Sequence, residues 1–339
     1  MRDIRVDILR FIGLSMIIFA HVEPPSILFQ LRNFDVPLMV LVSGMSFSLS
    51  YRYGLSYLSY VIKRLRRLIA PVWVFLTFFF LTMYLFGVNQ EKIDINTVFE
   101  SYALIGGIGY VWIIRVFIMV ALIAPFVFSF HRKVISNLKY YSYLSILFIF
   151  FEIIRYLTDP FISSGTLETL SYFTHYIIPY ALIFSLGIRL YSASIKFLLI
   201  VSIINLVIFV VLAYSLYLYS GELVPTQRFK YPPSYYYVSY AIFVAVGLFI
   251  ISESIFKVLN ILKLKLLIEF ISNNSIWIYL WHIPFIMLLP LDNFLLRYIV
   301  VYSCSLIATF IQVTIVKKII IPKCKSKKIQ DTINSVLTG

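Results

Sequence analysis

A charged stripe in the first hydrophobic segment, RDIRVDILRFIGLSMIIFAH, constrains the fold of this chain more than any other feature. Asp7, Arg10 and His21 lie in a stretch whose length and composition are typical of a membrane-spanning helix. Ionised groups inside a bilayer are costly unless they are paired or face a polar cavity. At about 100° per residue, Arg10 and His21 differ by only about 20° around a helix, and Asp7 shares their side. This face is therefore expected to turn towards a polar interior of the protein.

The composition predicts a protein that crosses a membrane many times. Of the 339 residues, 61% are hydrophobic and only 13% are charged, which is roughly half the charged fraction of a soluble protein. The first segment lacks a small-residue cleavage site before HVEPP and is followed by many further apolar stretches, so we do not expect a cleaved signal peptide. The two cysteines, Cys304 and Cys324, imply no disulfide framework.

Hydrophobic stretches with about the 20 residues that a membrane-spanning helix needs recur along the whole chain. Ten of them can be read, at approximately 4–22, 35–51, 68–88, 109–130, 142–158, 172–191, 196–219, 235–254, 266–289 and 298–320. The connections between them are brief, and none resembles a soluble domain. The expected fold is therefore an all-α integral membrane protein with about ten transmembrane helices.

The net charge of +14 is distributed unevenly between the predicted loops. With the N-terminus placed in the cytoplasm, 21 of the 29 Lys and Arg residues fall on the cytoplasmic side. Five fall on the other side: Arg32, Lys92, Arg228, Lys230 and Arg297. This bias predicts cytoplasmic N- and C-termini, and it explains the basic balance without a nucleic-acid partner. We expect a membrane domain over residues 1–321 and a short basic cytoplasmic tail over 322–339.

The longest outward loop that is rich in Pro and Tyr, GELVPTQRFKYPPSYYY, leaves two interpretations open. Its tyrosines fit the aromatic belt that forms at a membrane interface. They could also stack on sugar rings.

Two predicted spans carry histidines near their outer ends. His21 ends the first span, and a histidine can act as a general base near neutral pH. A hydrogen bond to a neighbouring carbonyl is the plainer alternative. In ISNNSIWIYLWHIPF, the side chains of Ser275, Tyr279 and His282 share one helical stripe, and Pro284 frees a backbone carbonyl, as is common beside cavities. This second stripe is a candidate lining for a substrate cavity.

The run KRLRRLIAPVW places three arginines at the cytoplasmic entry to the third span. Arg64 and Arg67 share a helix face if the helix extends that far, and Arg66 lies between them. Guanidinium groups bind phosphates through two parallel hydrogen bonds, so the cluster suits a multiply phosphorylated, nucleotide-like ligand. The alternative is a topology anchor that contacts lipid headgroups.

Other charges lie inside the predicted spans. Arg115 belongs to GYVWIIRVF, and Glu152 and Arg155 belong to FFEIIRYL. Glu152 and Arg155 are three residues apart and could neutralise each other, yet buried ion pairs in a membrane usually accompany a polar cavity. All three are candidate cavity residues. The sequence contains no phosphate-binding glycine loop, no clustered metal-ligand spacing and no GxSxG elbow, so no metal is expected.

Four short motifs follow one another along the chain. DILRFIGLSMIIFAH separates Arg10 from His21 by ten residues, and FDVPLMVLVSGMSFSLS contains a Ser-Gly pair. The sequence Arg64-x-x-Arg67 precedes APVW, and NSIWIYLWHIPF occurs late in the chain. In this order the motifs resemble those of the acyltransferase family 3 membrane proteins, which O-acylate bacterial surface glycans. GYVWIIRVFIMVALIAP is similar to the family's fourth span, although Arg115 stands where the family is more often apolar. The resemblance covers about residues 1–320.

The resemblance implies an O-acyltransferase of the cell membrane that moves an acyl group, by family frequency acetyl, from cytoplasmic acyl-CoA to a glycan hydroxyl. His21 would be the catalytic histidine and Arg10 its charged companion, while Asp7 either joins them or only neutralises Arg10. Arg64, Arg67 and Arg66 would hold the phosphates of acyl-CoA, which is a co-substrate and not a permanently bound cofactor. The expected partners are acyl-CoA, a carbohydrate acceptor and membrane lipids.

The main alternative is a transporter in which the buried charges mark a solute or proton pathway. The inverted repeats and paired broken helices common in transporters are not visible in the sequence. A glycan polymerase or ligase is a third possibility, but such proteins usually carry a large outward loop. The identities of the acceptor and of the acyl group stay open.

Overall fold

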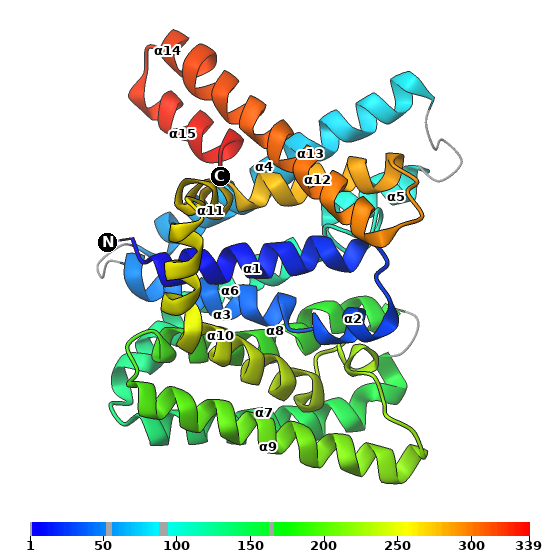
Figure 1. Cartoon of the computed structure of the whole chain (residues 1–339), viewed down its shortest axis with the longest axis vertical. Coiled ribbons are helices and arrows are strands. Elements are labelled where there is room, and N and C mark those ends of the chain that lie inside the picture. The colour runs from blue at the N-terminus through cyan, green and yellow to red at the C-terminus, as the bar shows by residue number, and fades with distance from the viewer. Residues whose placement is uncertain (1, 52–55, 88–93, 163–165) are drawn as a thin grey trace. The chain divides into compact units, whose positions relative to one another are not determined.

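The computed structural model describes residues 2–51, 56–87, 94–162 and 166–339, so Arg52 and Lys92, which entered the charge count, lie outside the described residues (Figure 1). Within these ranges the chain is helical, and the described residues form no β-strand beyond an isolated bridge between Lys230 and Pro233. The helices are α1 (Ile4–His21), α2 (Ser26–Leu31), α3 (Asp35–Ser50), α4 (Tyr57–Phe86), α5 (Ile95–Ala103), α6 (Trp112–Lys133), α7 (Asn137–Ile162), α8 (Thr166–Leu190), α9 (Ile195–Ser220), the 3-10 turn η2 (Thr226–Phe229), α10 (Tyr235–Ile261), α11 (Lys265–Asn273), α12 (Ser275–Leu288), α13 (Phe294–Ile315), the π-helical turn η3 (Val316–Ile320), α14 (Ile321–Lys323) and α15 (Lys327–Leu337).

The helical architecture confirms an all-α protein with multiple apolar, membrane-length helices. Seven helical segments of the described residues have the length and hydropathy needed to cross a membrane: Ser26–Ser50, Tyr57–Phe86, Trp112–Lys133, Leu167–Leu190, Ile195–Ser220, Tyr235–Ile261 and Phe294–Lys323. The other three predicted spans are not among these seven segments. Helices α1 and α7 contain several charged residues, and α12 has only 14 residues. The count of ten and the cytoplasmic termini stay predictions.

Three segments differ from the sequence-based bounds. Helix α4 begins at Tyr57, well before residue 68, so the basic run lies inside a helix and not at its start. The predicted ninth span is broken at Asn274 into α11 and α12, as expected for a residue whose amide competes with the helical backbone: Asn274 Nδ2 donates to the carbonyl of Phe270 at 2.7 Å. Most of the basic tail forms helix α15.

Helix ends follow local side-chain chemistry. Gly87 and Gly221 terminate α4 and α9 in the left-handed conformation, with φ of 66° and 74°, which costs glycine nothing because it has no Cβ. At the start of α10, the hydroxyl of Ser234 accepts from the backbone N–H of Tyr237. The connection between α9 and α10 thus runs from Gly221 to Ser234 and contains η2.

The helices pack into two units, which we describe separately. Unit 1 comprises Met1–Met16, Pro25–Gly54 and Met119–Lys265, and unit 2 comprises Ile17–Pro24, Leu55–Ile118 and Leu266–Gly339. Helix α1 is continuous and contributes to both units.

The core of unit 1 depends on a close approach of α3 and α8. A Cβ added to Gly44 would lie 2.2 Å from the carbonyl oxygen of Phe184, and one added to Gly187 would lie 2.1 Å from that of Leu41. Only glycine permits this backbone contact, so the Ser-Gly pair of the second predicted span has a packing role.

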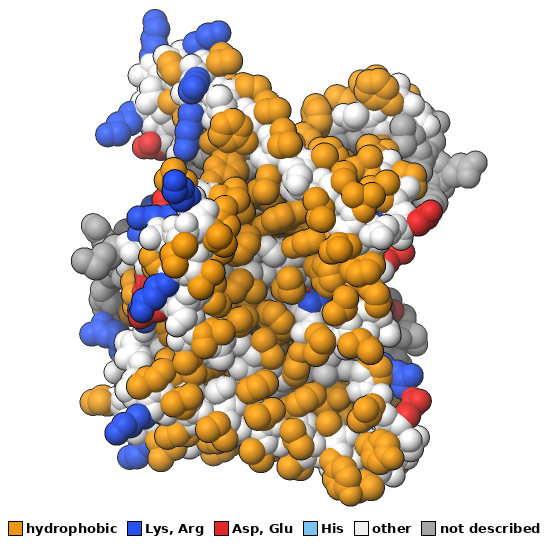
Figure 2. Space-filling model, viewed as in Figure 1, with side chains coloured by type: hydrophobic (Ala, Val, Ile, Leu, Met, Phe, Trp, Pro, Cys, Tyr) orange, Lys and Arg blue, Asp and Glu red, His pale blue; other side chains and the backbone are white. Residues whose placement is uncertain are grey.

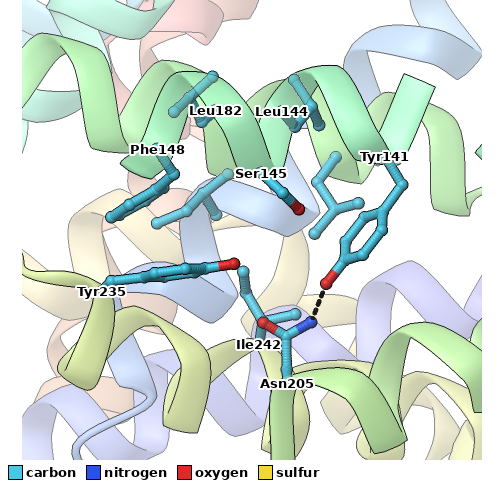
Figure 3. Close-up of a pocket in the computed structure, with 10 residues that line it drawn as sticks. Tyr141, Leu144, Ser145, Phe148, Leu182, Asn205, Tyr235 and Ile242 are labelled. Atoms are coloured by element: carbon cyan, nitrogen blue, oxygen red, sulfur yellow. Dashed lines mark hydrogen bonds between the residues drawn. The ribbon is translucent and has the colours of Figure 1, made fainter. Parts of the chain in front are cut away.

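Unit 1 also contains a small cavity between α7, α8, α9 and α10, of about 20 Å³, which is room for about one water. Figure 3 shows Tyr141, Ser145, Asn205 and Tyr235 around it, with Asn205 Nδ2 donating to the hydroxyl of Tyr141 at 2.7 Å. The remaining lining is apolar, so the cavity is too small and too apolar to hold an acyl donor or a sugar.

In unit 2, α12 packs against α13, and both α12 and α15 pack against α4. The side chains of two tryptophans and a glutamine tie these helices together. Trp277 Nε1 donates to the carbonyl of Val336 at 2.9 Å, and Gln312 Nε2 donates to that of Leu337 at 2.7 Å. Trp281 Nε1 donates to Gln312 Oε1 at 2.7 Å. The C-terminal helix is thus an integral part of unit 2.

Apolar side chains remain exposed on the helix surfaces, as expected of a membrane protein. On α9 they include Leu199, Ile200, Ile203, Val207 and Val210. Figure 2 shows hydrophobic side chains covering the visible faces of α9 and α10, with Lys and Arg side chains at the margins of that face. Lipid chains rather than water suit such a surface.

Candidate active site

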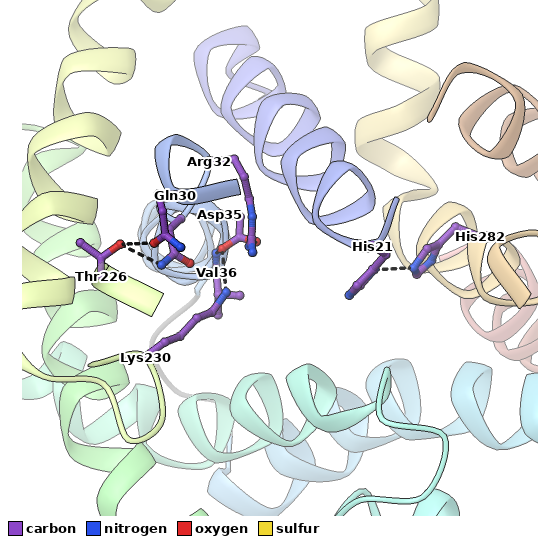
Figure 4. Close-up of polar contacts among 9 residues, drawn as sticks. His21, Gln30, Arg32, Asp35, Val36, Thr226, Lys230 and His282 are labelled. Carbon is purple, nitrogen blue, oxygen red and sulfur yellow. Dashed lines mark hydrogen bonds and ion pairs between the residues drawn. The ribbon is translucent and has the colours of Figure 1, made fainter. Parts of the chain in front are cut away.

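A pair of histidines forms the centre of the candidate site, within unit 2. His21 ends α1, and His282 lies in the middle of α12. His21 Nδ1 and His282 Nε2 are 2.9 Å apart, and the two rings stack with centroids 5.0 Å apart at an interplanar angle of 15° (Figure 4). The side chain of His282 is completely buried. Residues separated by most of the chain are therefore brought into direct contact.

The hydrogen bonds of His282 assign the proton positions of the pair. His282 Nδ1 contacts the backbone carbonyl of Tyr279, and because a carbonyl only accepts, Nδ1 carries a proton. In the neutral imidazole, Nε2 is then the acceptor, so His21 Nδ1–H donates to it. This leaves His21 Nε2 as the basic nitrogen of the pair. His21 can take up a proton there and still donate from Nδ1 to His282.

Two tyrosines enclose the pair. The ring of Tyr110 meets His21 edge-on at a centroid distance of 4.9 Å and His282 at 5.8 Å. The Tyr279 hydroxyl donates to the backbone carbonyl of Tyr110. These contacts restrict rotation of both imidazoles, which a catalytic base requires.

An ion pair joins Glu23, two residues after His21, to Arg297. Glu23 Oε1 lies 3.6 Å from Arg297 Nη1, and Arg297 Nη2 donates to the carbonyl of Ile286 at 3.0 Å. Arg297 thereby links the segment after α1 to the end of α12.

The sequence model of the family described as "Acyltransferase domain", acyltransferase family 3, matches residues 3–317. The chain belongs to this family. Searches of curated proteins and of solved structures gave no match. The matched residues include both motifs that supply the histidine pair. The match confirms the resemblance seen in the sequence, and the chain is a membrane acyltransferase.

The charged part of the α1 stripe lies in unit 1. Asp7 is buried and accepts from Arg2 Nε at 2.6 Å, with Arg10 Nη1 at 3.8 Å. Arg10 Nη2 donates to Ser46 Oγ of α3 at 2.7 Å. Along the helix axis Arg10 and His21 are separated by about 16 Å. In this acyltransferase, Arg10 thus contacts Asp7 of its own helix and Ser46 of α3.

The predicted arginine cluster lies on α4, in the same unit as the histidine pair. The helix begins early enough for Arg64 and Arg67 to share a face, while Arg66 lies on a different side; both Arg66 and Arg67 are exposed. The Arg64 guanidinium lies over the ring of Tyr60 at 5.6 Å. Further along α4, Phe75 and Phe78 pack against the ring of Trp281, the neighbour of His282. One helix thus connects the cluster to the histidine site over about 16 Å from Arg64 to Phe75.

The remaining predicted site residues have mainly structural contacts. Ser275 is the first residue of α12 and is half-buried. Arg115 donates to the carbonyls of Leu104 at 2.9 Å and Ile105 at 3.2 Å, which anchors the segment after α5. Glu152 pairs with Arg155 at 2.9 Å and accepts from the first backbone N–H of α10, at Tyr235.

Glu152 and Arg155 belong to unit 1, whereas Arg115 and Ser275 belong to unit 2 with the histidines. Among the described residues, no group of three or more His, Cys, Asp and Glu is placed to hold a metal ion.

Sequence reasoning missed two features. The first is Tyr110, for which the available signal was a position two residues before Trp112 at the start of a predicted span. A buried charge cluster of Arg32, Asp35 and Lys230 in unit 1 was also missed. The arginine and the lysine were counted as loop charges, and only the fold brings them to Asp35.

Proposed function

We propose that this acyltransferase moves an acyl group, in the simplest case acetyl, from cytoplasmic acyl-CoA to a hydroxyl of a cell-surface or lipid-linked glycan at the plasma membrane. The contact between His21 and His282 carries the proposal. A buried histidine that fixes the orientation and tautomer of a second histidine is the arrangement that a general base needs.

The proton transfers follow from the assigned hydrogen bonds. His21 Nε2 removes the proton of the acceptor hydroxyl while the oxygen attacks the thioester carbonyl carbon. The new C–O bond forms, the C–S bond breaks, and the CoA thiolate leaves. The imidazolium of His21, stabilised by its bond to His282 Nε2, then returns the proton to the thiolate. An acylated His21 that passes the group to the sugar in a second step is the alternative route.

Donor binding is assigned to the shared face of Arg64 and Arg67, with Arg66 nearby on α4. Arginine forks match phosphate oxygens in geometry and charge. A CoA thioester carries its acyl group at the end of a long flexible arm, so the phosphates and the reacting carbonyl can occupy different parts of one unit. The contacts of α4 with the ring beside His282 support this arrangement.

The test uses membranes that contain the full chain, acyl-labelled CoA and a preparation of surface glycan. Label should enter the glycan with the wild type and fall by about 100-fold or more with His21→Ala, the usual range for loss of a general base. Arg64→Gln combined with Arg67→Gln should raise KM for the donor, whereas Lys63→Gln, an exposed cation on the same helix, should not. Solute uptake without covalent transfer would instead favour a transporter. Mass spectrometry of the labelled glycan identifies the acyl group and the acceptor.

A further inference from the structure

A buried cluster of three charged side chains lies in unit 1. Arg32 precedes α3, Asp35 is its first residue, and Lys230 follows η2. Arg32 Nη1 donates to Asp35 Oδ2 at 2.6 Å, and Lys230 Nζ donates to Asp35 Oδ1 at 3.3 Å (Figure 4). The exposed fractions of these side chains are only 4%, 2% and 3%. The cluster joins the start of α3 to the connection 221–234.

The charges of the cluster do not balance. Among the described residues, only Asp35 brings a carboxylate oxygen within ion-pair distance of either cation. Two buried cations against one buried anion leave an excess positive charge. Burying an uncompensated charge is strongly unfavourable, so this arrangement indicates a site that receives a second negative charge.

Arg32, Lys230 and the neighbouring Tyr237 have hydrogen-bond donors with capacity to spare. Arg32 Nε and the hydroxyl of Tyr237 are buried and have no hydrogen-bond partner among the described residues. The ammonium of Lys230 has three N–H groups, and its Nζ lies 5.9 Å from the ring centroid of Tyr237. A carboxylate or a phosphate, which accepts several charge-assisted hydrogen bonds at once, suits these donors.

We propose that Arg32, Lys230 and Tyr237, with Asp35 as internal counter-ion, bind the carboxylate or phosphate of an acidic sugar in the acceptor glycan. The sugar source rests on the proposed function above. The ring of Tyr231 lies next to Lys230, 5.7 Å from its Nζ, and is 46% exposed. The Tyr231 ring also stacks on Tyr176 at a centroid distance of 6.5 Å, and its exposed part offers a sugar ring an aromatic contact at the edge of the cluster. The three charged side chains are buried, and Lys230 itself belongs to the connection 221–234.

The pKa of Lys230 supports an anion-binding site at this cluster. Burial lowers the pKa of Lys230 to about 8, with Asp35 acting to raise it and Arg32 to lower it. A bound oxyanion would favour the charged ammonium, so binding should weaken as Lys230 loses its proton, by about tenfold per pH unit above about 8. The other titratable groups that face Lys230, directly or through a neighbour, are Asp35, Arg32, Tyr231, Tyr237, Tyr176 and Tyr180.

The experiment measures equilibrium binding to the purified full chain in phosphatidylcholine nanodiscs, without acyl-CoA. Glucuronate and glucose 6-phosphate should bind, and glucose should bind at least about tenfold more weakly, because one charge-assisted interaction is lost. Lys230→Met should weaken glucuronate binding about tenfold or more. Arg228→Gln, which removes a 64%-exposed cation from the same connection, should leave it unchanged.

Equal binding of glucose and glucuronate would overturn the proposal, as would an unchanged affinity in a folded Lys230→Met variant. Where that variant does not fold, the wild type decides: glucuronate binding that stays constant from pH 7 to pH 9.5 refutes the role of Lys230. Loss of sugar binding in phosphatidylglycerol nanodiscs would assign the site to a lipid headgroup. Because no transfer is measured, failure here leaves acyl transfer untouched, and failure of acyl transfer leaves this binding result standing.

Discussion

Replacing His282 tests the central interaction of the proposed mechanism. His282→Leu fills a similar volume with an apolar side chain and removes the acceptor for His21 Nδ1–H. It also removes the contact to the carbonyl of Tyr279. His21 itself stays in place, but its ring loses the partner that fixes its orientation and stabilises its imidazolium.

The size of the effect follows from the type of bond that is lost. A hydrogen bond to a charged group contributes about 1.5–3 kcal/mol, and each 1.36 kcal/mol changes a rate about tenfold. The rate constant of transfer, kcat, should therefore fall about 10- to 150-fold. The KM for the donor should stay within about twofold, since the phosphates are assigned to α4. His282→Gln, whose amide oxygen can accept from His21 Nδ1–H, should recover part of the loss.

The assay is initial-rate transfer of labelled acyl groups at saturating and limiting acyl-CoA, normalised to the amount of folded protein. His175→Leu is the matched control, since it removes another buried histidine, bonded to Thr158 in unit 1 at 2.8 Å. An unchanged kcat in folded His282→Leu would refute the reasoning. So would a fall equal to that of the control, or a Gln variant no better than Leu.

Two further predictions concern stability in detergent. Gly44→Ala should lower Tm, because a Cβ 2.2 Å from the Phe184 carbonyl oxygen forces α3 and α8 apart at a cost of about 1–3 kcal/mol. The control is Gly247→Ala, which should not lower Tm, because a Cβ there meets nothing within 4 Å. Equal shifts of Tm in the two variants would contradict this packing. Burial lowers the pKa of Lys230 from 10.5 to about 8. Between pH 8 and pH 10.5 the unfolded chain therefore binds more protons than the folded chain. The free energy of unfolding, measured without sugar acids, should thus rise by about 2 kcal/mol from pH 7 to pH 9.5. Denaturation at both pH values should show this rise weakened in Lys230→Met and retained in the exposed-site variant Lys196→Met; a rise of the same size in Lys230→Met refutes the assignment.

The helical segments were readable from sequence because hydrophobic length is a local property. The stretches around α9 and α10 are apolar over their full length, and their bounds agree with the prediction to within several residues. Boundaries that depend on polar residues were less predictable. The basic run lies inside α4 and not before it, and Asn274 interrupts a segment that hydropathy alone joins.

The sequence by itself determined the membrane class, the family and the two histidine motifs, since these depend on composition and on spacing within single helices. Only the tertiary structure decided which polar groups meet. It placed His21 on His282 and brought Lys230 to Asp35, whereas the pair of Glu152 and Arg155 lies within one helix and was readable from their spacing. The physical reason is that a buried polar group must find a partner. The periodicity of one helix shows which way a side chain points, but the partner comes from another helix whose position depends on packing.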